Sequence, residues 1–272
     1  MTTDGGIWAV STVMTRQNKV PVNLAELDGM DYTLALIPFW DMANHAYPGL
    51  SPTKARHVAE TCYNPEREQL ECSLPHPVDT QSSEPIFIYY GTRTDAEFLV
   101  HNGFVYPQNP YTSVQKRFAL TPAIPLFKER SHLLDLLGMP TSGVFSFGLA
   151  DKSRLPVPIA PELMTLARVS TMTDRELEQY TTMEPMLRQE LIACEPLQVS
   201  PLNERADRWL ATVMKIMLRR YATTIEDDEA LLKANRQMHH IRRLLIEYRI
   251  AEKLTLHSWV ARLCPTVPVK AE

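Results

Sequence analysis

The chain has 272 residues, of which 44% are hydrophobic and 22% are charged, as in an ordinary globular protein. Its formal net charge of -4 gives no electrostatic reason to expect a nucleic-acid partner. No stretch approaches the roughly 18 consecutive apolar residues of a membrane span, and the N-terminus lacks the basic start and apolar core of a signal peptide. We therefore expect a cytoplasmic protein, with an additional nuclear pool as the alternative, that has no nucleic-acid or membrane partner.

The cysteines and histidines do not form the pattern of a metal site. The four cysteines contain no C-x-x-C pair, so we expect free thiols in a reducing compartment. His45 is a candidate metal ligand or general base, but the other histidines are not spaced as ligands with it. His239 and His240 are adjacent and point to different helix faces, so they cannot form the i, i+4 pair of a zinc helix. The sequence predicts no metal site, and it contains no P-loop, dinucleotide glycine motif or serine elbow.

The first 110 residues contain short apolar runs separated by turn-forming residues, the pattern of a β-rich part with long loops. Pro38 ends one strand candidate because proline removes a ladder hydrogen bond, and residues 107–110 read as a boundary. The expected elements are a short helix or ordered segment at 7–18, a loop at 19–32, strands at 33–39, 67–73 and 86–90, and a short helix at 95–101.

Beyond about residue 125 the hydrophobic spacing becomes helical. Thr173 and Glu176 match a capping box, in which the threonine accepts from an early backbone N–H group and the glutamate reaches back. The expected helices lie at 126–137, 161–169, 203–221 and 225–256. These patterns predict an α+β protein with a β-rich domain at residues 1–110 and an α-helical domain at 111–265.

Two apolar stretches, residues 36–45 and 86–93, each end in a cluster of polar side chains. Polar side chains at the ends of strands are common in binding and catalytic sites. From spacing alone, Asn44, His45 and Tyr90, with Arg93, indicate a polar pocket but do not name a reaction.

Three motifs together resemble the SET-domain methyltransferases that carry a C-terminal substrate-binding lobe of the Rubisco large-subunit methyltransferase type. The motifs are Trp8-Ala-Val-Ser-Thr-Val-Met-Thr-Arg-Gln-Asn18, Trp40-Asp-Met-Ala-Asn-His45 and Tyr90-Gly-Thr-Arg93. The resemblance continues through the helical part to about Leu256 and begins inside the family's catalytic domain. It implies that residues 1–110 are the C-terminal half of a SET domain and that residues 111–265 are the substrate-binding lobe.

The resemblance implies a protein methyltransferase that uses S-adenosyl-L-methionine. By position in the motifs, Tyr90 and Asn18 are implied to act at the reacting atoms, and Trp40 and Arg93 to contact the substrate side chain. The residues implied to contact the cofactor are Arg16, Asp41, Met42, Ala43, Asn44, His45, Asn102, Gly103 and Phe104. Lysine-specific relatives tend to present an aromatic residue where Asn18 stands. Asn18 with Trp40 therefore favours a histidine target, and the likeness to the actin-directed members implies actin as the protein substrate.

The sequence departs from the family pattern in several places. Asp95 replaces a usual asparagine, Asn102 replaces a small residue, and residues 76–84 replace a compact acidic-glycine turn. The Gly-rich cofactor strand of the family has no counterpart here. Two alternatives therefore stay open: a catalytically inactive SET protein that serves as a protein-binding module, and a protein-lysine methyltransferase.

Overall fold

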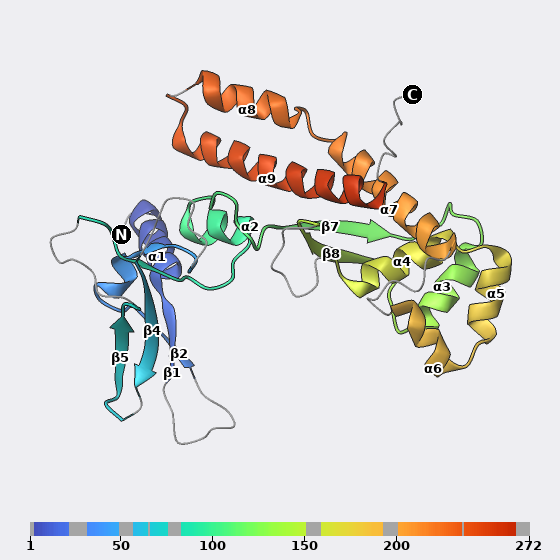
Figure 1. The fold of residues 1–272 in the computed structure, drawn as a ribbon, viewed down its shortest axis with the longest axis horizontal. Helices are drawn as coiled ribbons and strands as arrows, with labels where there is room; N and C mark the ends of the chain where they lie inside the picture. The colour runs from blue at the N-terminus through green and yellow to red at the C-terminus, as the bar shows by residue number, and fades with distance from the viewer. Residues whose placement is uncertain are drawn as a thin grey trace, which may run out of the picture. The chain divides into compact units, whose positions relative to one another are not determined.

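The computed structural model describes residues 3–21, 32–48, 57–64, 66–75, 83–150, 159–192, 201–235 and 237–264. The chain divides into two compact units (Figure 1). Unit 1 comprises residues 1–93 and 97–107, and unit 2 comprises residues 94–96 and 108–272. The short segment 94–96 therefore belongs to unit 2 by its contacts, although unit 1 surrounds it in the sequence.

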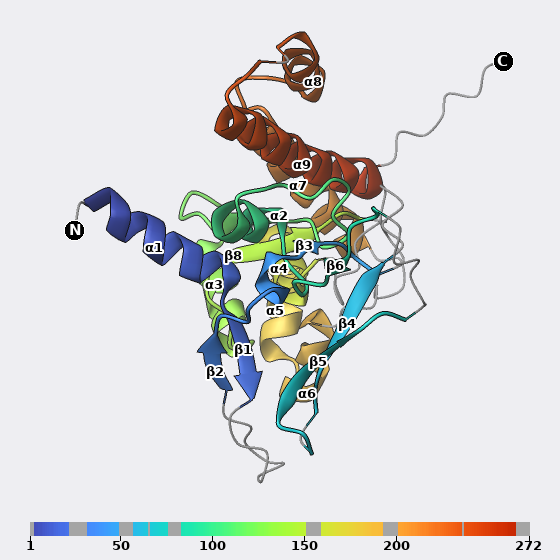
Figure 2. The same cartoon turned by 90° about the vertical axis from the view of Figure 1, so that its left-hand side faces the viewer.

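Unit 1 combines an exposed helix with two small sheets (Figure 2). The helix α1 (Thr3–Arg16) agrees with the helix or ordered segment predicted at 7–18, and a strand follows it where a loop was predicted, so that Arg16 and Asn18 lie at the junction. The further elements are β1 (Asn18–Pro21), β2 (Tyr32–Ala35), the 3-10 helix η1 (Trp40–Met42), β3 (Asn44–His45), β4 (Val58–Asn64), β5 (Gln69–Ser73), β6 (Phe87–Ile88) and the π-helix η2 (Phe98–Asn102). The short helix α2 (Asp95–Glu97) precedes η2, and its first two residues belong to unit 2.

The four-stranded sheet of unit 1 joins segments that lie far apart in the sequence. Its strand order is β3-β6-β4-β5, and β6 pairs in parallel with both β3 and β4. His45 lies opposite Ile88, which is 2% exposed, and β6 is paired along both of its edges. The register therefore brings the Asn44–His45 motif beside the strand that leads to Tyr90.

The segment that follows Tyr90 is held by buried polar contacts and a left-handed glycine. Gly103 ends η2 with φ 76, a conformation that glycine adopts without steric cost. The carboxylate of Asp95 is 2% exposed and accepts hydrogen bonds from the Thr112 hydroxyl at 2.6 Å and from the Asn109 amide at 3.1 Å. Burial raises the pKa of Asp95, and both hydrogen bonds act in the opposite direction.

Unit 2 is a helical assembly with one two-stranded antiparallel sheet. In that sheet Val114 lies opposite Phe147. The elements are β7 (Ser113–Ala119), α3 (Phe127–Leu136), β8 (Ser142–Gly148), α4 (Pro161–Thr171), α5 (Asp174–Thr182), α6 (Pro185–Arg188), the 3-10 helix η3 (Gln189–Ile192), α7 (Pro201–Leu218), α8 (Ile225–Ala234) and α9 (His240–Leu263).

A leucine-rich core holds unit 2 together. Leu133, Leu166 and Leu210, from α3, α4 and α7, are fully buried in one cluster with Phe147 of β8. Each such side chain contributes about 1.5–3 kcal/mol when it leaves water. The indole N–H of Trp259 on α9 donates to the Gly148 carbonyl at 2.6 Å, so its polar atom is satisfied.

Capping boxes begin two of the helices in unit 2. Thr173 accepts from the backbone N–H of Glu176, and the Glu176 carboxylate accepts from the backbone N–H of Thr173, which confirms the predicted start of α5. Thr224 and Asp227 form the same arrangement at the start of α8. Each box satisfies two N–H groups that would otherwise lack an intrahelical partner.

Several predicted elements differ from the structure. The expected single helix at 225–256 is wrong: α8 ends at Ala234 and α9 starts at His240, because Asn235 leaves the helical conformation with φ -118 and ψ 79. The strands β7 and β8 lie inside the part predicted to be helical, and β1 occupies the start of the predicted loop at 19–32. The strand predicted at 86–90 is reduced to Phe87–Ile88, because only these two residues pair with neighbours.

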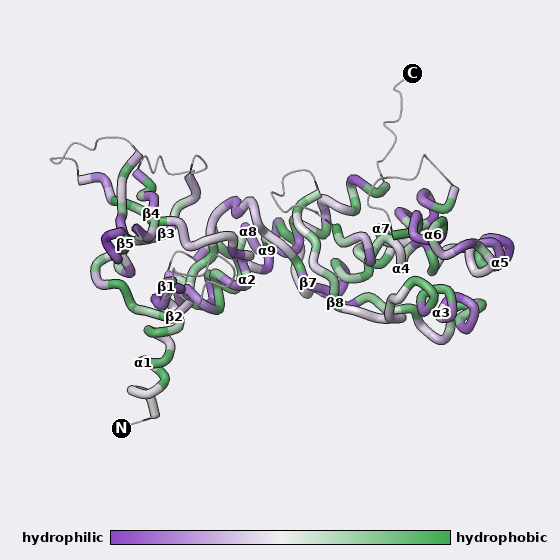
Figure 3. The backbone as a smooth tube through the Cα atoms, turned by 90° about the horizontal axis from the view of Figure 1, so that it is seen from below, coloured by the Kyte–Doolittle hydropathy of each residue, from purple (hydrophilic) through white to green (hydrophobic). Residues whose placement is uncertain are grey.

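The described parts of the chain contain no helix that is both long and apolar enough to cross a bilayer. Figure 3 shows that hydrophilic stretches, such as those on β5 and α5, interrupt the hydrophobic ones along the tube. The cysteines Cys62, Cys72 and Cys264 are free, and Cys194 lies outside the described residues.

Candidate functional site

Tyr90 lies two residues after β6, and two hydrogen bonds hold its side chain and its backbone in place. Its hydroxyl donates to the Ala43 carbonyl at 2.6 Å, and the backbone N–H of Tyr90 donates to His45 Nδ1 at 3.2 Å. Gly91 follows with φ 90, which lets the chain turn directly after Tyr90. Burial raises the pKa of the Tyr90 phenol, so the hydroxyl stays protonated at neutral pH although Arg16 and Arg93 act in the opposite direction.

His45 is a buried imidazole that is surrounded by aromatic rings. Because Nδ1 accepts from Tyr90, the neutral ring carries its proton on Nε2, and this atom has no hydrogen-bond partner among the described residues. Burial lowers the pKa of His45 to about 4; a hydrogen bond with the Ile88 backbone acts in the opposite direction, and the charge of Arg93 acts in the same direction as burial. The rings whose centroids lie 4.5–5.9 Å from the imidazole are those of Tyr47, Tyr89, Tyr90, Phe98 and Tyr106.

The junction between α1 and β1 carries the guanidinium of Arg16 and the amide of Asn18. A guanidinium nitrogen of Arg16 donates to the Asp41 carbonyl at 2.5 Å and lies 3.8 Å from the sulfur of Met42. The amide nitrogen of Asn18 donates to the Arg16 carbonyl at 2.9 Å. This bond fixes the orientation of the Asn18 amide, and its Oδ1 is the atom that remains to accept a hydrogen bond.

Hydrogen bonds orient the side chains of Arg93 and Trp40. Arg93 donates from Nε to the Tyr90 carbonyl at 3.2 Å and from a terminal nitrogen to the Asn102 Oδ1 at 2.7 Å. The indole N–H of Trp40 donates to the Thr61 hydroxyl at 2.8 Å. Both side chains are therefore oriented by contacts within unit 1.

A small cavity connects these side chains, and its open volume is about 20 Å³, which is close to that of one water molecule. All four predicted catalytic and substrate-contacting residues line it, together with Arg16, Asp41 and Asn102 of the predicted cofactor set. The other six predicted cofactor residues are not among the lining residues, and one of them, Met42, is 69% exposed; the six are Met42, Ala43, Asn44, His45, Gly103 and Phe104. The lining residues are Thr15, Arg16, Gln17, Asn18, Trp40, Asp41, Ile88, Tyr90, Arg93 and Asn102.

Sequence reasoning missed the aromatic surroundings of His45 and the partner of Trp40. Tyr47 and Tyr106 lie in different loops and Phe98 begins η2, and no spacing in the sequence links them to His45. Thr61 reaches Trp40 because β4 pairs with β6, a long-range pairing that a single sequence does not reveal. Thr15 and Gln17 also line the cavity, and their only signal in the sequence is that they flank the predicted Arg16.

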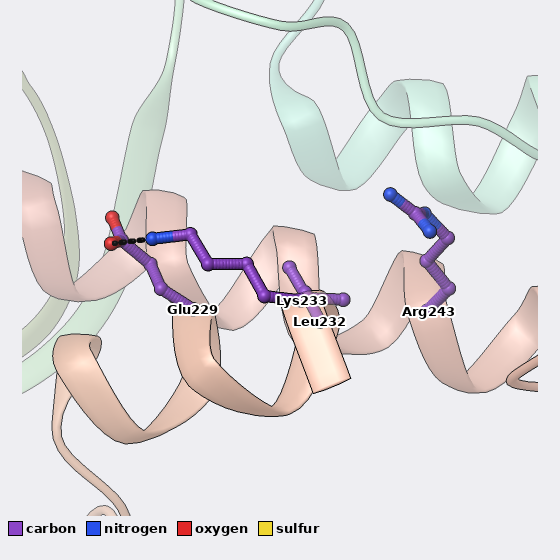
Figure 4. Close-up of a pocket in the computed structure, with 4 residues that line it drawn as sticks. All are labelled: Glu229, Leu232, Lys233 and Arg243. Atoms are coloured by element: carbon purple, nitrogen blue, oxygen red, sulfur yellow. Dashed lines mark ion pairs between the residues drawn. The ribbon is translucent and has the colours of Figure 1, made fainter. Parts of the chain in front are cut away.

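Unit 2 has a separate, open hollow of about 500 Å³ between α8 and α9 (Figure 4). Glu229 and Lys233 form an ion pair along α8 at 3.6 Å, Leu232 lies beside them, and Arg243 belongs to α9. One leucine and three charged side chains do not make the apolar lining that is typical of a small-molecule site. The described residues also contain no group of three or more His, Cys, Asp or Glu side chains that could hold a metal ion.

Residues 121–256, half of the chain, match the family model described as Rubisco LSMT substrate-binding, and the chain belongs to this family. Among curated relatives it is similar to the actin-histidine N-methyltransferases of Homo sapiens, at 33% identity, and of Canis lupus familiaris, at 34% identity, each over 255 residues. These matches cover 93% of this chain but only 39% and 40% of the two relatives. The chain thus spans about two fifths of the length of these relatives.

Solved structures support the same fold. The SET domain of LSMT bound to lysine and AdoHcy matches with a TM-score of 0.62 at 20% identity, over 97% of this chain and 55% of that chain. Rubisco LSMT bound to AdoMet matches with a TM-score of 0.60 at 21% identity, over 96% and 55% of the two chains. The α+β architecture predicted from the sequence, SET-type with the substrate-binding lobe, is confirmed.

Proposed function

We propose that the chain carries the tyrosine and the target-side-chain pocket of an S-adenosyl-L-methionine-dependent protein-histidine N-methyltransferase that acts on actin. One observation carries the proposal: Asn18, Trp40 and Tyr90, with Arg93, line a single cavity although they come from three distant segments. The names of the relatives, which methylate histidine in actin, support the same reaction and substrate.

The polar groups around Tyr90 fit a zwitterionic nucleoside cofactor. Arg16 supplies a cation for a carboxylate, Asp41 supplies an anion for an ammonium group, and Asn44 is an exposed amide beside them. We assign cofactor contact to these residues, to Met42, Ala43 and His45 on the same segment, and to Asn102, Gly103 and Phe104 after η2. When bound, the cofactor supplies an electrophilic methyl group on a sulfonium sulfur.

Asn18 is the residue that suits a histidine target. A neutral imidazole has one nitrogen with a lone pair and one N–H group, and the lone pair is the nucleophile. Because the Asn18 amide nitrogen is engaged with the Arg16 carbonyl, its Oδ1 would accept from the imidazole N–H. That hydrogen bond selects the tautomer whose other nitrogen is unprotonated, and the flat Trp40 ring limits how the imidazole turns.

Tyr90 would act by position rather than as a base. Its hydroxyl is protonated and bound to the Ala43 carbonyl, so the oxygen lone pairs are the part of the group directed at the reacting methyl. Holding the oxygen in this way costs no reorganisation when the methyl group moves to the target nitrogen. Arg93, bound to the Tyr90 carbonyl, keeps the turn at Gly91 in place.

The protein-binding module is the second candidate, and the lining of the cavity favours it. Only Arg16, Asp41 and Asn102 of the residues assigned to the cofactor line the cavity, and its open volume of about 20 Å³ is close to that of one water molecule. Under this alternative, unit 2 keeps its substrate-binding role while unit 1 is inert. Lysine methylation is disfavoured, because the Asn18 amide matches an imidazole N–H better than it matches an alkyl ammonium stem.

Calorimetric binding of S-adenosylhomocysteine to the 272-residue chain tests the proposal first. Saturable binding, followed by methyl transfer to actin, is the expected result. Tyr90→Phe should then lower the transfer rate by about 100-fold, the scale of a lost positioning contact. Tyr89→Phe is the matched control, because the Tyr89 hydroxyl contacts Thr92 and does not line the cavity. A folded chain that fails to bind the ligand would contradict the proposal and leave the binding module.

A further inference from the structure

Asn102, the last residue of η2, connects two walls of the cavity. Its Oδ1 accepts from a terminal nitrogen of Arg93 at 2.7 Å, and its amide nitrogen donates to the Thr15 carbonyl at 3.5 Å, near the end of α1. Arg93 also donates from Nε to the Tyr90 carbonyl at 3.2 Å. The acceptors of these two Arg93 bonds are neutral oxygens, so the bonds set the direction of the guanidinium without neutralising its charge.

The charged side chains that line the cavity do not balance. Among the described residues, the lining contains two arginines, Arg16 and Arg93, and one carboxylate, Asp41. Burial raises the pKa of the Tyr90 phenol, which therefore stays neutral at pH 7; both arginines lower that pKa, and Asp41 raises it by less than either of them lowers it. The potential that these three charges produce at the Tyr90 hydroxyl is therefore positive.

A bound cofactor would leave the charge of Arg93 as the net charge of this lining. The zwitterion assigned above has one carboxylate for Arg16 and one ammonium group for Asp41, so these two charges are paired when it binds. The charge of Arg93 also acts on its surroundings: burial lowers the pKa of the His45 imidazole, and Arg93 lowers it further. A cation that entered the target-side-chain pocket beside Arg93 would meet the same repulsion.

We infer that Arg93, directed by the neutral amide of Asn102, is a specificity-determining residue that makes the target-side-chain pocket electropositive and restricts it to side chains that are uncharged at neutral pH. The inference rests on the proposed function, which supplies the pocket and its target. Histidine is mostly neutral at pH 7 because its ordinary pKa is about 6.5, whereas lysine, with an ordinary pKa of about 10.4, is charged. The charge of Arg93 therefore adds to the selection of an imidazole by Asn18.

Peptide binding to the full chain tests the inference without methyl transfer. An actin peptide with the target histidine, and the same peptide with lysine at that position, are titrated by fluorescence anisotropy with saturating S-adenosylhomocysteine, whose sulfur is uncharged. At pH 7 the lysine peptide should bind about ten-fold more weakly. The dissociation constant of the histidine peptide should rise about six-fold between pH 7 and pH 5, because repulsion lowers the pKa of the bound imidazole from about 6.5 to about 5.5.

Two variants separate the charge of residue 102 from its size. Asn102→Asp places a carboxylate against Arg93 with little change of shape, so the lysine peptide should gain about ten-fold in affinity and the pH dependence of the histidine peptide should disappear. Asn102→Ser is neutral and should keep both the preference for histidine and its pH dependence. A peptide with glutamine at the target position should bind with the same affinity at both pH values, which assigns the dependence to the target side chain.

Arg93→Gln removes the cation itself and should reproduce the effects of Asn102→Asp, so the inference stays testable if one of these variants does not fold. Equal affinities of the unaltered chain for the histidine and lysine peptides at pH 7 would overturn the inference, as would identical behaviour of Asn102→Ser and Asn102→Asp. An unaltered chain that binds neither S-adenosylhomocysteine nor either peptide would overturn the proposed function, and the inference with it.

Discussion

The two units differ in how a buried ionisable side chain is paired. In unit 2 the carboxylate of Asp228 is fully buried and contacts both Lys253 and Arg249, with the Lys253 ammonium at 2.7 Å. In unit 1 the imidazole of His45 is also buried, yet its Nε2 has no partner among the described residues. The first arrangement is charged and satisfied, and the second is neutral and incomplete.

The difference separates a structural site from a candidate reactive one. Lys253 also donates to the backbone carbonyls of Thr223 and Thr224 in the turn before α8, so with Asp228 every proton of its ammonium group has an acceptor. Such a network fixes the start of α8 against α9. An unsatisfied buried group costs free energy, and functional sites are where proteins tolerate that cost.

The largest effect should come from removing the carboxylate of Asp228. Asp228→Ala leaves the 2% exposed Lys253 without its anion, so we expect a loss of about 3–5 kcal/mol in the unfolding free energy of unit 2. Urea denaturation followed by far-UV circular dichroism measures it. The double variant Asp228→Leu with Lys253→Met removes both charges and should lose much less. Equal losses in the two variants would show that packing, and not the unpaired charge, decides.

The pH dependence should expose the same network in acid. Burial alone would raise the pKa of Asp228, but hydrogen bonds from Arg249 and Lys253 outweigh it and lower the pKa to about 2. The folded pKa lies below the unfolded value of 3.8, so this stabilisation is present above pH 4 and is lost as the pH falls toward 2. The stabilisation that Asp228 gives to unit 2 should therefore be lost only below about pH 4.

Unit 1 should weaken at a higher pH, because of His45. Its folded pKa of about 4 lies below the ordinary 6.5, so the unfolded chain takes up the proton first and stability falls as the pH drops from 6.5 to 4. The total loss is about 3 kcal/mol. His45→Asn keeps an acceptor near the Tyr90 N–H group and should abolish this slope. A slope that persists in the variant would assign the effect to another group.

The two capping boxes should give intermediate effects. Thr173→Ala and Thr224→Ala each remove a side-chain acceptor for a backbone N–H group, at a cost of about 1 kcal/mol. The corresponding serine variants keep the hydroxyl and should stay within a few tenths of a kcal/mol. Differential scanning calorimetry should place both alanine variants about 2–4 °C lower. No shift for Thr224→Ala would mean that Lys253 alone holds the start of α8.

The smallest effect should come from the exposed ion pair of the α8–α9 hollow. The Lys233 side chain is 79% exposed and pairs with Glu229 four residues earlier on the same helix. Lys233→Gln should cost less than about 0.5 kcal/mol, and the difference should vanish at high salt. Urea midpoints at low and high salt test this. A cost comparable to that of Asp228→Ala would contradict the view that burial decides the value of these pairs.

Much of the fold was predictable because its signals are local. The leucine spacing of α3, the proline start of α4 and the Thr173–Glu176 box are each contained within one helix, and the structure has them as expected. The break at Asn235 was missed because residues 225–256 keep a helical hydrophobic pattern across it. The strands β7 and β8 were missed because their pairing spans the whole of α3.

The motif residues of the candidate site were predictable from the sequence, but their hydrogen-bond partners were not. Tyr90, Asn18 and Trp40 were identified because their motifs are contiguous in the sequence, and the structure places them around one cavity. Their partners, such as Ala43 for Tyr90 and Thr61 for Trp40, depend on strand pairing and on backbone atoms. A backbone carbonyl carries no residue signature, so no motif could have named it.

The placement of Asp95 limits how this chain can be dissected. A protease or a cloning boundary at Pro107 would leave Asp95 in the first fragment and its two buried donors, Asn109 and Thr112, in the second. In the excised helical lobe, Asn109 and Thr112 would then lack the carboxylate that accepts their hydrogen bonds. The other fragment would expose the Asp95 carboxyl, whose pKa burial raises in the intact chain. A fragment that starts before residue 94 and includes unit 2 keeps the three residues together. We expect this fragment to fold with Asp95 buried and hydrogen-bonded.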